Sequence, residues 1–453
     1  MKQSKQTDRL IEAPMPKLLW QMCSQTTMSV MLFSLYSLAD TFFVARGVGA
    51  YAAGAVALSA PIIQVIGAFA SALGAGGASI ISRALGAKDE EKAAQTAANT
   101  FMLFWICTSI LSVIGLAFID PLLRLLAADA VLMPYAKGYA RIILLGAVTA
   151  TGFSSLIRAE GNIKFSIIQW VVPTLVNLAL DPLFIFAFGW GVEGAAAATV
   201  IAQIVSTCLS MYYFLLSKYH AYPIRRSHFR IRPKLMREIL TIGSPTVLSQ
   251  LMNSAFLVAI NHRLGAFGGP DALSAFGIVG RIKSFLTMPL LGIVQGLQPI
   301  IGFNYAAKRI DRVRAAIRLA IVFSLLYGAA AALLCIAVPG QLMGLFIVEQ
   351  GIIGIGAVAL RIIAASLPFM GAITIAAACY TAMGKAMIAF AFPIVSVLLV
   401  SLPALYVLSS LFALSGIWYT YPVSDIIMFA LSTLSLRYVL KQQDNKHGEA
   451  ITQ

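Results

Sequence analysis

The chain has 453 residues, of which 59% are hydrophobic and only 11% are charged, and its mean hydropathy is +0.86. A soluble globular protein carries about 25% charged residues, so this composition leaves too few polar side chains to cover a water-facing surface. A formal net charge of +15 could indicate a nucleic-acid-binding protein. The basic residues are, however, concentrated at the chain ends and in alternate loops, as in a membrane protein, which excludes nucleic acid as the partner. The sequence predicts an all-α, multi-pass membrane protein whose surroundings are the lipid bilayer.

Apolar runs of about 20 residues, each long enough to cross a hydrocarbon core of ~30 Å, recur along the whole chain. The alternation typical of membrane barrels is absent, so we expect helices. Twelve spans are predicted, at residues 18–42, 52–76, 97–119, 138–158, 164–188, 194–216, 239–261, 272–300, 316–338, 352–380, 386–408 and 414–436.

Most of the 33 Lys and Arg residues lie at the two ends of the chain and in alternate loops. Cytoplasmic loops of membrane proteins carry an excess of Lys and Arg. The pattern therefore predicts that both termini are cytoplasmic.

The two halves of the chain resemble each other at an offset of about 220 residues. Matched pairs include IISRALGAK (80–88) with IIGFNYAAK (300–308), AEGN (159–162) with AMGK (382–385), and Gly194 with Gly416. Each half holds six predicted spans, an even number, so both copies run in the same direction and are related by a pseudo-twofold along the membrane normal. The predicted parts are an N-terminal six-helix lobe at 1–216, a basic cytoplasmic linker at 217–238 and a C-terminal six-helix lobe at 239–453.

Three acids fall well inside apolar spans: Asp40, Asp181 and Asp425. A carboxylate opposes membrane insertion by roughly 2.5–3.5 kcal/mol at a helix centre, so each acid needs a compensating role. Asn177 lies one helical turn before Asp181 and shares its face, and Thr199 in the next span offers a hydroxyl. Such oxygen donors suit Na⁺ as well as a proton. Two alternatives stay open: Asp181 caps a helix broken at the following proline, and Asp40 reaches the outer interface.

Four longer stretches carry a family resemblance. They are SLYSLADTFFVARGVG (34–49), GAGGASIISRALGAKD (74–89), NLALDPLFIFAFGWGVEGAAAAT (177–199) and GRIKSFLTMPLLGIVQGLQPIIGFNYAAKR (280–309). Over nearly its whole length the chain resembles the multidrug and toxic compound extrusion (MATE) family, bacterial type, nearest the DinF/MepA-like branch. The resemblance implies twelve helices in two six-helix lobes, a place in the bacterial inner membrane, and export of organic cations against an inward H⁺ or Na⁺ gradient.

The resemblance also implies a cation site in the N-terminal lobe. The family's first-span Asp, fifth-span Asn and Asp, and sixth-span Thr match Asp40, Asn177, Asp181 and Thr199, where H⁺ or Na⁺ would bind. Tyr36, one turn before Asp40, is the expected hydrogen-bond partner. No cofactor is expected.

The chain departs from the family at two points. Gln25 stands where the first helix usually carries a proline, and the spans 239–261 and 352–380 contain no acid. We therefore expect the C-terminal lobe to lack an equivalent cation site. Asp425 is the remaining candidate there, and otherwise it is paired with an Arg or Lys of that lobe.

Methionine, aromatic and amide side chains in several spans suit a surface that adapts to varied hydrophobic cations. The expected lining of the substrate cavity is Met31, Phe33, Met252, Asn253, Phe256, Arg281, Gln295 and Asp425. Each of these has a packing role as its alternative. Arg281 and Lys283 either balance an acid or are satisfied by backbone and water.

The predicted function is secondary active antiport, in which amphipathic organic cations or drugs leave in exchange for H⁺ or Na⁺, by a protein acting as a monomer. The alternative is a flippase for a lipid-linked precursor, which needs a strongly basic cavity. An enzyme is not expected, because no His lies deep in a span and the five Cys residues form no paired motif.

Overall fold

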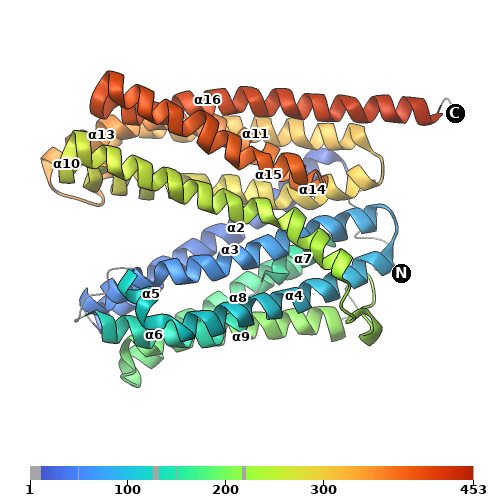
Figure 1. Cartoon of the computed structure of the whole chain (residues 1–453), viewed down its shortest axis with the longest axis horizontal. Coiled ribbons are helices and arrows are strands. Elements are labelled where there is room, and N and C mark those ends of the chain that lie inside the picture. The colour runs from blue at the N-terminus through green and yellow to red at the C-terminus, as the bar shows by residue number, and fades with distance from the viewer. Residues whose placement is uncertain (1–11, 49, 126–131, 150–151, 217–220, 452–453) are drawn as a thin grey trace. The chain divides into compact units, whose positions relative to one another are not determined.

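The computed structural model describes residues 12–48, 50–125, 132–149, 152–216 and 221–451 (Figure 1). All regular secondary structure in these ranges is helical. The chain divides into two compact units: unit 1 is Met1–Glu12 with Met28–Thr246, and unit 2 is Ala13–Thr27 with Val247–Gln453. The lobes 1–216 and 239–453 and the linker 217–238 remain predictions.

Unit 1 holds most of the first half of the chain. Its helices are the later part of α2 (Met15–Gly47), α3 (Ala50–Gly86), α4 (Glu90–Ala117), α5 (Ile119–Leu125), α6 (Met133–Gly146), α7 (Phe153–Ala159), α8 (Ile163–Pro182) and α9 (Gly191–Met211). Shorter turns are η1 (Ala147–Thr149), η2 (Leu183–Ala187), η3 (Tyr212–Leu216) and η4 (Arg226–His228). The core cluster of this unit lies where α3, α6 and α9 meet and includes Ile66, Tyr139, Ile143 and Ala195.

Unit 2 holds the start of α2 and the second half of the chain. Its elements are α10 (Pro233–Ala306, which begins in unit 1), α11 (Ile310–Ala337), α12 (Pro339–Gly344), α13 (Gln350–Ala364), α14 (Leu367–Ala382), α15 (Ala386–Ile394), η5 (Val395–Ser401) and α16 (Leu402–Ile451). Its core cluster draws on α10, α11, α13 and α16 and includes Phe276, Ile282, Leu360 and Trp418.

In the described part of the chain, eight helices are long and apolar enough to cross a membrane, or up to nine if α13 and α14 form one bent span. The number twelve remains a prediction. The helix α10 contains two of the predicted spans and turns at Gly269, where φ is 61°. The helix α16 contains the last predicted span and the end of the one before it, and it turns at Ala413, where φ is 49°. Turns this tight leave no loop between the helices that they join.

Two predicted spans are broken where we expected continuous helices. Residues 138–158 are divided among α6, η1 and α7. Residues 352–380 bend by 52° between α13 and α14, and Pro368 stands at the start of α14. Proline cannot donate a backbone hydrogen bond and favours the first turn of a helix, so the second break has a local cause.

The same helix crossing occurs once in each unit. In unit 2 the start of α2 packs on α10, where the Thr26 hydroxyl donates to the Gly292 carbonyl at 2.6 Å. A Cβ on Gly292 would lie 2.3 Å from Thr27 Cα. In unit 1 the start of α10 packs on α3, and a Cβ on Gly243 would lie 2.2 Å from the Ala72 carbonyl oxygen. Ala72 and Gly292 are related by the 220-residue repeat, so both copies use the same close contact.

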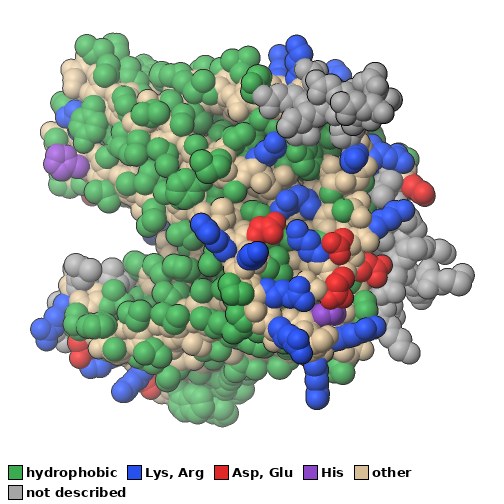
Figure 2. All heavy atoms as spheres, turned by 45° about the vertical axis from the view of Figure 1, so that its right-hand side comes forward, with side chains coloured by type: hydrophobic (Ala, Val, Ile, Leu, Met, Phe, Trp, Pro, Cys, Tyr) green, Lys and Arg blue, Asp and Glu red, His purple; other side chains and the backbone are tan. Residues whose placement is uncertain are grey.

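The surface has the character of a lipid-facing one. On the face shown in Figure 2, hydrophobic side chains predominate on the left-hand part, and most of the Lys and Arg side chains gather on the right-hand part. Large apolar side chains such as Leu216, Leu399 and Leu411 are more than half exposed. A bilayer satisfies such a surface, whereas water does not.

Candidate coupling site

Asn177 and Asp181 lie one turn apart near the end of α8. Both are almost fully buried, with 1% and 0% of their surface exposed. Pro182 follows directly, and the chain then widens into the π-helical turn η2. Because both residues are packed inside unit 1, neither side chain faces lipid, as the spacing in the sequence predicts.

The Asn177 amide connects α8 to α9. Its orientation is assigned from the hydrogen bonds that it can make. With Nδ2 toward the carboxylate, it donates to Asp181 Oδ2 at 2.9 Å and its oxygen accepts from the Thr199 backbone N–H at 3.1 Å. The opposite orientation gives only a 3.4 Å contact from Nδ2 to the Thr199 hydroxyl. The first orientation therefore satisfies both ends of the amide.

Small residues let α9 approach this point. A Cβ on Gly194 would lie 3.0 Å from the Phe184 carbonyl oxygen of η2, and Ala195, Ala196 and Ala198 are fully buried. Small side chains of this kind allow membrane helices to pack at close range. The run 194–198 therefore positions Thr199 against α8.

A carboxylate, an amide oxygen and a hydroxyl can together hold a small hard cation or a proton. The structure brings Asn177, Asp181 and Thr199 together, as expected. Asp40 and Tyr36 lie in the helix α2, but their side chains are outside the described residues. Their part in the site remains a prediction.

The residues predicted to line a substrate cavity are divided between the two units. Met31, 38% exposed, belongs to unit 1, and the side chain of Phe33 is outside the described residues. The others belong to unit 2: Met252, Asn253, Phe256, Arg281, Gln295 and Asp425. A common cavity remains a prediction.

A further buried acid, Glu160, was missed by the sequence analysis. It lies between α7 and α8, outside the membrane spans, and is only 1% exposed. One carboxylate oxygen accepts from the Tyr213 hydroxyl and from the Ala221 backbone N–H, each at 3.0 Å. Burial raises the pKa of Glu160 from 4.5 to about 7, although these hydrogen bonds act in the opposite direction.

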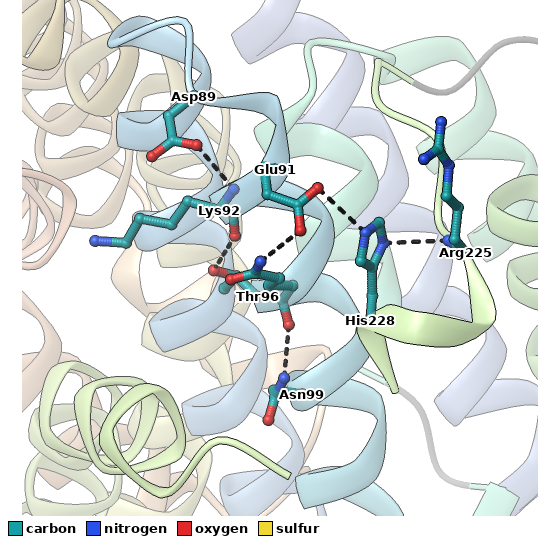
Figure 3. A network of polar contacts seen from close by, with 8 residues as sticks. Asp89, Glu91, Lys92, Thr96, Asn99, Arg225 and His228 are labelled. Carbon is teal, nitrogen blue, oxygen red and sulfur yellow. Dashed lines mark hydrogen bonds and ion pairs between the residues drawn. The ribbon is translucent and has the colours of Figure 1, made fainter. Parts of the chain in front are cut away.

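The segment 221–232 is fastened to the first turns of α4 (Figure 3). His228 Nδ1 accepts from the Arg225 backbone N–H at 3.1 Å, and His228 Nε2 lies 3.3 Å from Glu91 Oε2. Further on, the Arg232 backbone N–H donates to Asn99 Oδ1 at 3.0 Å. The segment predicted as a basic linker is therefore packed on unit 1 along its described part.

Comparisons with known proteins agree over the length of the chain. A family model described as MatE matches residues 26–183 and 245–407. The probable multidrug resistance protein YoeA of Bacillus subtilis (strain 168) is 26% identical over 430 residues, 92% of each chain. The multidrug export protein MepA of Staphylococcus saprophyticus is 24% identical over 416 residues, 91% of each chain. A solved outward-facing structure of a multidrug resistance MATE family transporter of the MOP superfamily has a TM-score of 0.91 at 25% identity, covering 96% of this chain and 98% of that one.

Proposed function

The chain belongs to the MATE family of transporters, and from this we propose that it exports amphipathic organic cations in exchange for H⁺ or Na⁺. The family consists of multi-pass membrane transporters and not of enzymes. Relatives at about 25% identity are named as multidrug resistance or multidrug export proteins, which supports multidrug export as the general function. The coupling ion and the class of substrate are the parts that we propose here.

The observation that carries the proposal is the burial of Asp181 against Asn177 and Thr199. A carboxylate inside a membrane-spanning helix bundle is costly unless it is neutralised. A proton or Na⁺ from outside would neutralise it, and its departure to the cytoplasm would restore the charge. Binding and release at this point therefore give the bundle two states of different charge.

Exchange would follow from competition between these states. A cation entering from outside would neutralise Asp181, change the packing of unit 1 and lower its affinity for the bound drug. One charge that crosses 100 mV contributes about 2.3 kcal/mol, and one pH unit adds about 1.4 kcal/mol. Together these terms could sustain roughly 500-fold accumulation of a neutral substrate, and less of a cationic one.

The flippase alternative gains no support from the described residues. It needs basic side chains that face a shared cavity and hold a pyrophosphate. Arg281 is exposed, and Lys283 lies over the ring of Tyr421. Neither arrangement favours an anionic headgroup.

The test uses the full chain in sealed vesicles, with a fluorescent organic cation as substrate and with pH and Na⁺ gradients imposed separately. We expect at least one gradient to drive accumulation. Asp181→Asn and Asp40→Asn should abolish the response to that gradient, because an amide keeps the shape of the side chain but cannot release a proton or attract Na⁺.

The matched control is Asp120→Asn. Asp120 forms a surface ion pair with Lys137 at 2.7 Å, and its loss should leave exchange unchanged. If Asp181→Asn protein at normal levels accumulates substrate with unchanged pH and Na⁺ dependence, the coupling site lies elsewhere.

A further inference from the structure

Unit 2 holds a second group of charged and polar side chains within its predicted spans. Lys283 comes from α10, Tyr421 and Asp425 stand one turn apart on α16, and Ser366 directly precedes α14. The Lys283 ammonium lies 3.9 Å from the centroid of the Tyr421 ring. Lys283 and Asp425 attract each other electrostatically, at a separation beyond the 4.0 Å of a direct ion pair.

The surroundings of this ammonium are aromatic and apolar. Phe256 and Phe276 pack on the Tyr421 ring, with centroids 5.9 and 6.4 Å away, and Trp418 stacks on Phe276 at 6.1 Å. A charge placed here without compensation is unfavourable, because the ammonium has lost part of its water. The face of an aromatic ring attracts a cation but does not replace that water, so Lys283 also needs its carboxylate.

The carboxylate side of the group has polar neighbours. Ser366 lies beside Asp425 and interacts with it. The hydroxyls of Ser366 and Ser424 are buried, and in the described chain neither has a hydrogen-bond partner within ordinary distance. Lys283 and Asp425 are thus the charged groups that the described residues bring together here, with the Tyr421 ring against the ammonium.

The internal repeat relates this group to the site in unit 1. Gly194 matches Gly416 at an offset of 222 residues, and the same offset takes Thr199 to Tyr421. The span that corresponds to α8 is 386–408, which contains no acid and no amide. The unit 2 counterpart of α8 therefore offers no carboxylate or amide oxygen to a free cation, and at the position of Thr199 unit 2 has the Tyr421 ring, with the Lys283 ammonium over it.

We infer that Lys283 is a tethered cation, which neutralises the embedded carboxylate of unit 2 permanently, as the exchangeable H⁺ or Na⁺ does in unit 1. Unit 2 then takes up no coupling ion, and each cycle uses the site in unit 1 alone. This inference rests on the proposed function in one respect: it takes the Asp181 site to be the exchangeable one.

The test is a double-mutant cycle on the full chain. Lys283→Met keeps the length of the side chain and removes its charge, and Asp425→Asn removes the opposite charge. Each single variant should lower transport at least about tenfold, because it leaves one partly buried charge without a partner. The double variant should return to within about threefold of the unmodified protein, since the two effects are coupled.

A second readout separates a tethered cation from a merely structural pair. In Lys283→Met, Asp425 has lost its cation and should recruit one, so thermal stability in detergent should gain a new dependence on Na⁺ or on acidic pH. The gain should persist when Asp181→Asn is added and vanish in the double variant with Asp425→Asn. Arg318→Met, at an exposed basic residue of α11 in the same unit, should change neither readout.

Two results would overturn the inference. One is Lys283→Met protein with normal transport and an unaltered ion dependence of its stability, and the other is a double variant as impaired as the worse single one. The proposed antiport is tested by a different result. If the unmodified protein shows no exchange, but the stability of Lys283→Met still gains the new ion dependence, then antiport is wrong and the tethered cation is supported.

Discussion

The two repeats keep the same packing and differ in chemistry. In both, the start of the first helix crosses a second helix at a glycine, at Gly243 in unit 1 and at Gly292 in unit 2. Only unit 1 follows this with a buried carboxylate bound to an amide, Asp181 with Asn177. The corresponding helix of unit 2 has neither.

The difference shows which features a duplicated bundle must retain. A glycine at a close crossing cannot be replaced without moving the backbone of its neighbour, so each copy has one at the crossing, although on opposite helices: the repeat relates Gly292 to Ala72 and Gly243 to Cys23. A buried polar group is needed only where it performs a task, and otherwise an apolar side chain costs less. A feature found in both units therefore points to a packing role, and a polar group found in only one unit points to a chemical role.

The largest effect is expected at Asn177→Leu, which removes the donor to Asp181 from unit 1 and makes it resemble unit 2. Breaking a buried charged contact costs about 3–5 kcal/mol, so exchange in vesicles should fall roughly a hundredfold. Gln169→Leu is the matched control, because Gln169 is also buried on α8 and donates to the Ser206 carbonyl at 3.1 Å. It should lower stability without altering ion dependence, and a shared loss of ion dependence would argue against a local site.

The next effect concerns Glu160, for which the repeat places the buried Met383 in unit 2. Since burial raises the pKa of Glu160 from 4.5 to about 7, the folded protein holds a proton that the unfolded chain loses above pH 4.5. Stability should therefore be highest below pH 4.5 and fall by about 3 kcal/mol as the pH rises to 7.

Glu160→Gln should flatten this part of the stability curve, measured by thermal unfolding across the pH range, because the amide keeps an acceptor oxygen and carries no charge. Met383→Glu should introduce a similar decline into unit 2. An unchanged curve in Glu160→Gln would mean that another group titrates.

A smaller effect is expected at the crossings. Gly243→Ala places a Cβ against the Ala72 carbonyl and should destabilise the protein by about 2 kcal/mol. Gly292→Ala should cost a similar amount if the two crossings are equivalent. Gly280→Ala, where a Cβ meets nothing within 4 Å, should be neutral or slightly stabilising. Thermal unfolding of the three variants measures the comparison, and equal effects at all three would contradict it.

The smallest effect is at a turn that the repeat places at Gly191 in unit 1 and at Ala413 in unit 2. Both residues have positive φ, 58° and 49°, a region that strains alanine and suits glycine. Ala413→Gly should stabilise the protein by about 1 kcal/mol, and Gly191→Ala should destabilise it by a similar amount. Opposite shifts in melting temperature are the expected result, and shifts of the same sign would show that other contacts decide.

Part of the site could be predicted because it rests on local spacing. Asn177 and Asp181 lie four residues apart, and the small run before Thr199 marks a close helix approach. Glu160 could not be found in this way. Its burial depends on Tyr213 and Ala221, which are 53 and 61 residues away in the sequence, and no periodic pattern records such contacts.

The fold shows the same limit. Apolar runs predicted helices, since hydrophobicity and length are properties of the segment itself. The bend between α13 and α14 and the turns within α10 and α16 depend on how neighbouring helices pack. The attraction between Lys283 and Asp425 likewise joins helices that are distant in the sequence, so the sequence analysis could only leave that pairing open.

The two helix crossings differ in the order in which their partners are synthesised. The start of α10 finds α3 already synthesised, whereas Thr26 must wait for Gly292, which is 266 residues further along the chain. At roughly 5–20 residues per second, the ribosome needs about 15–50 s to reach that partner. During this interval the first membrane segment lacks its final contacts, and chaperones or the insertion machinery have their longest access to it.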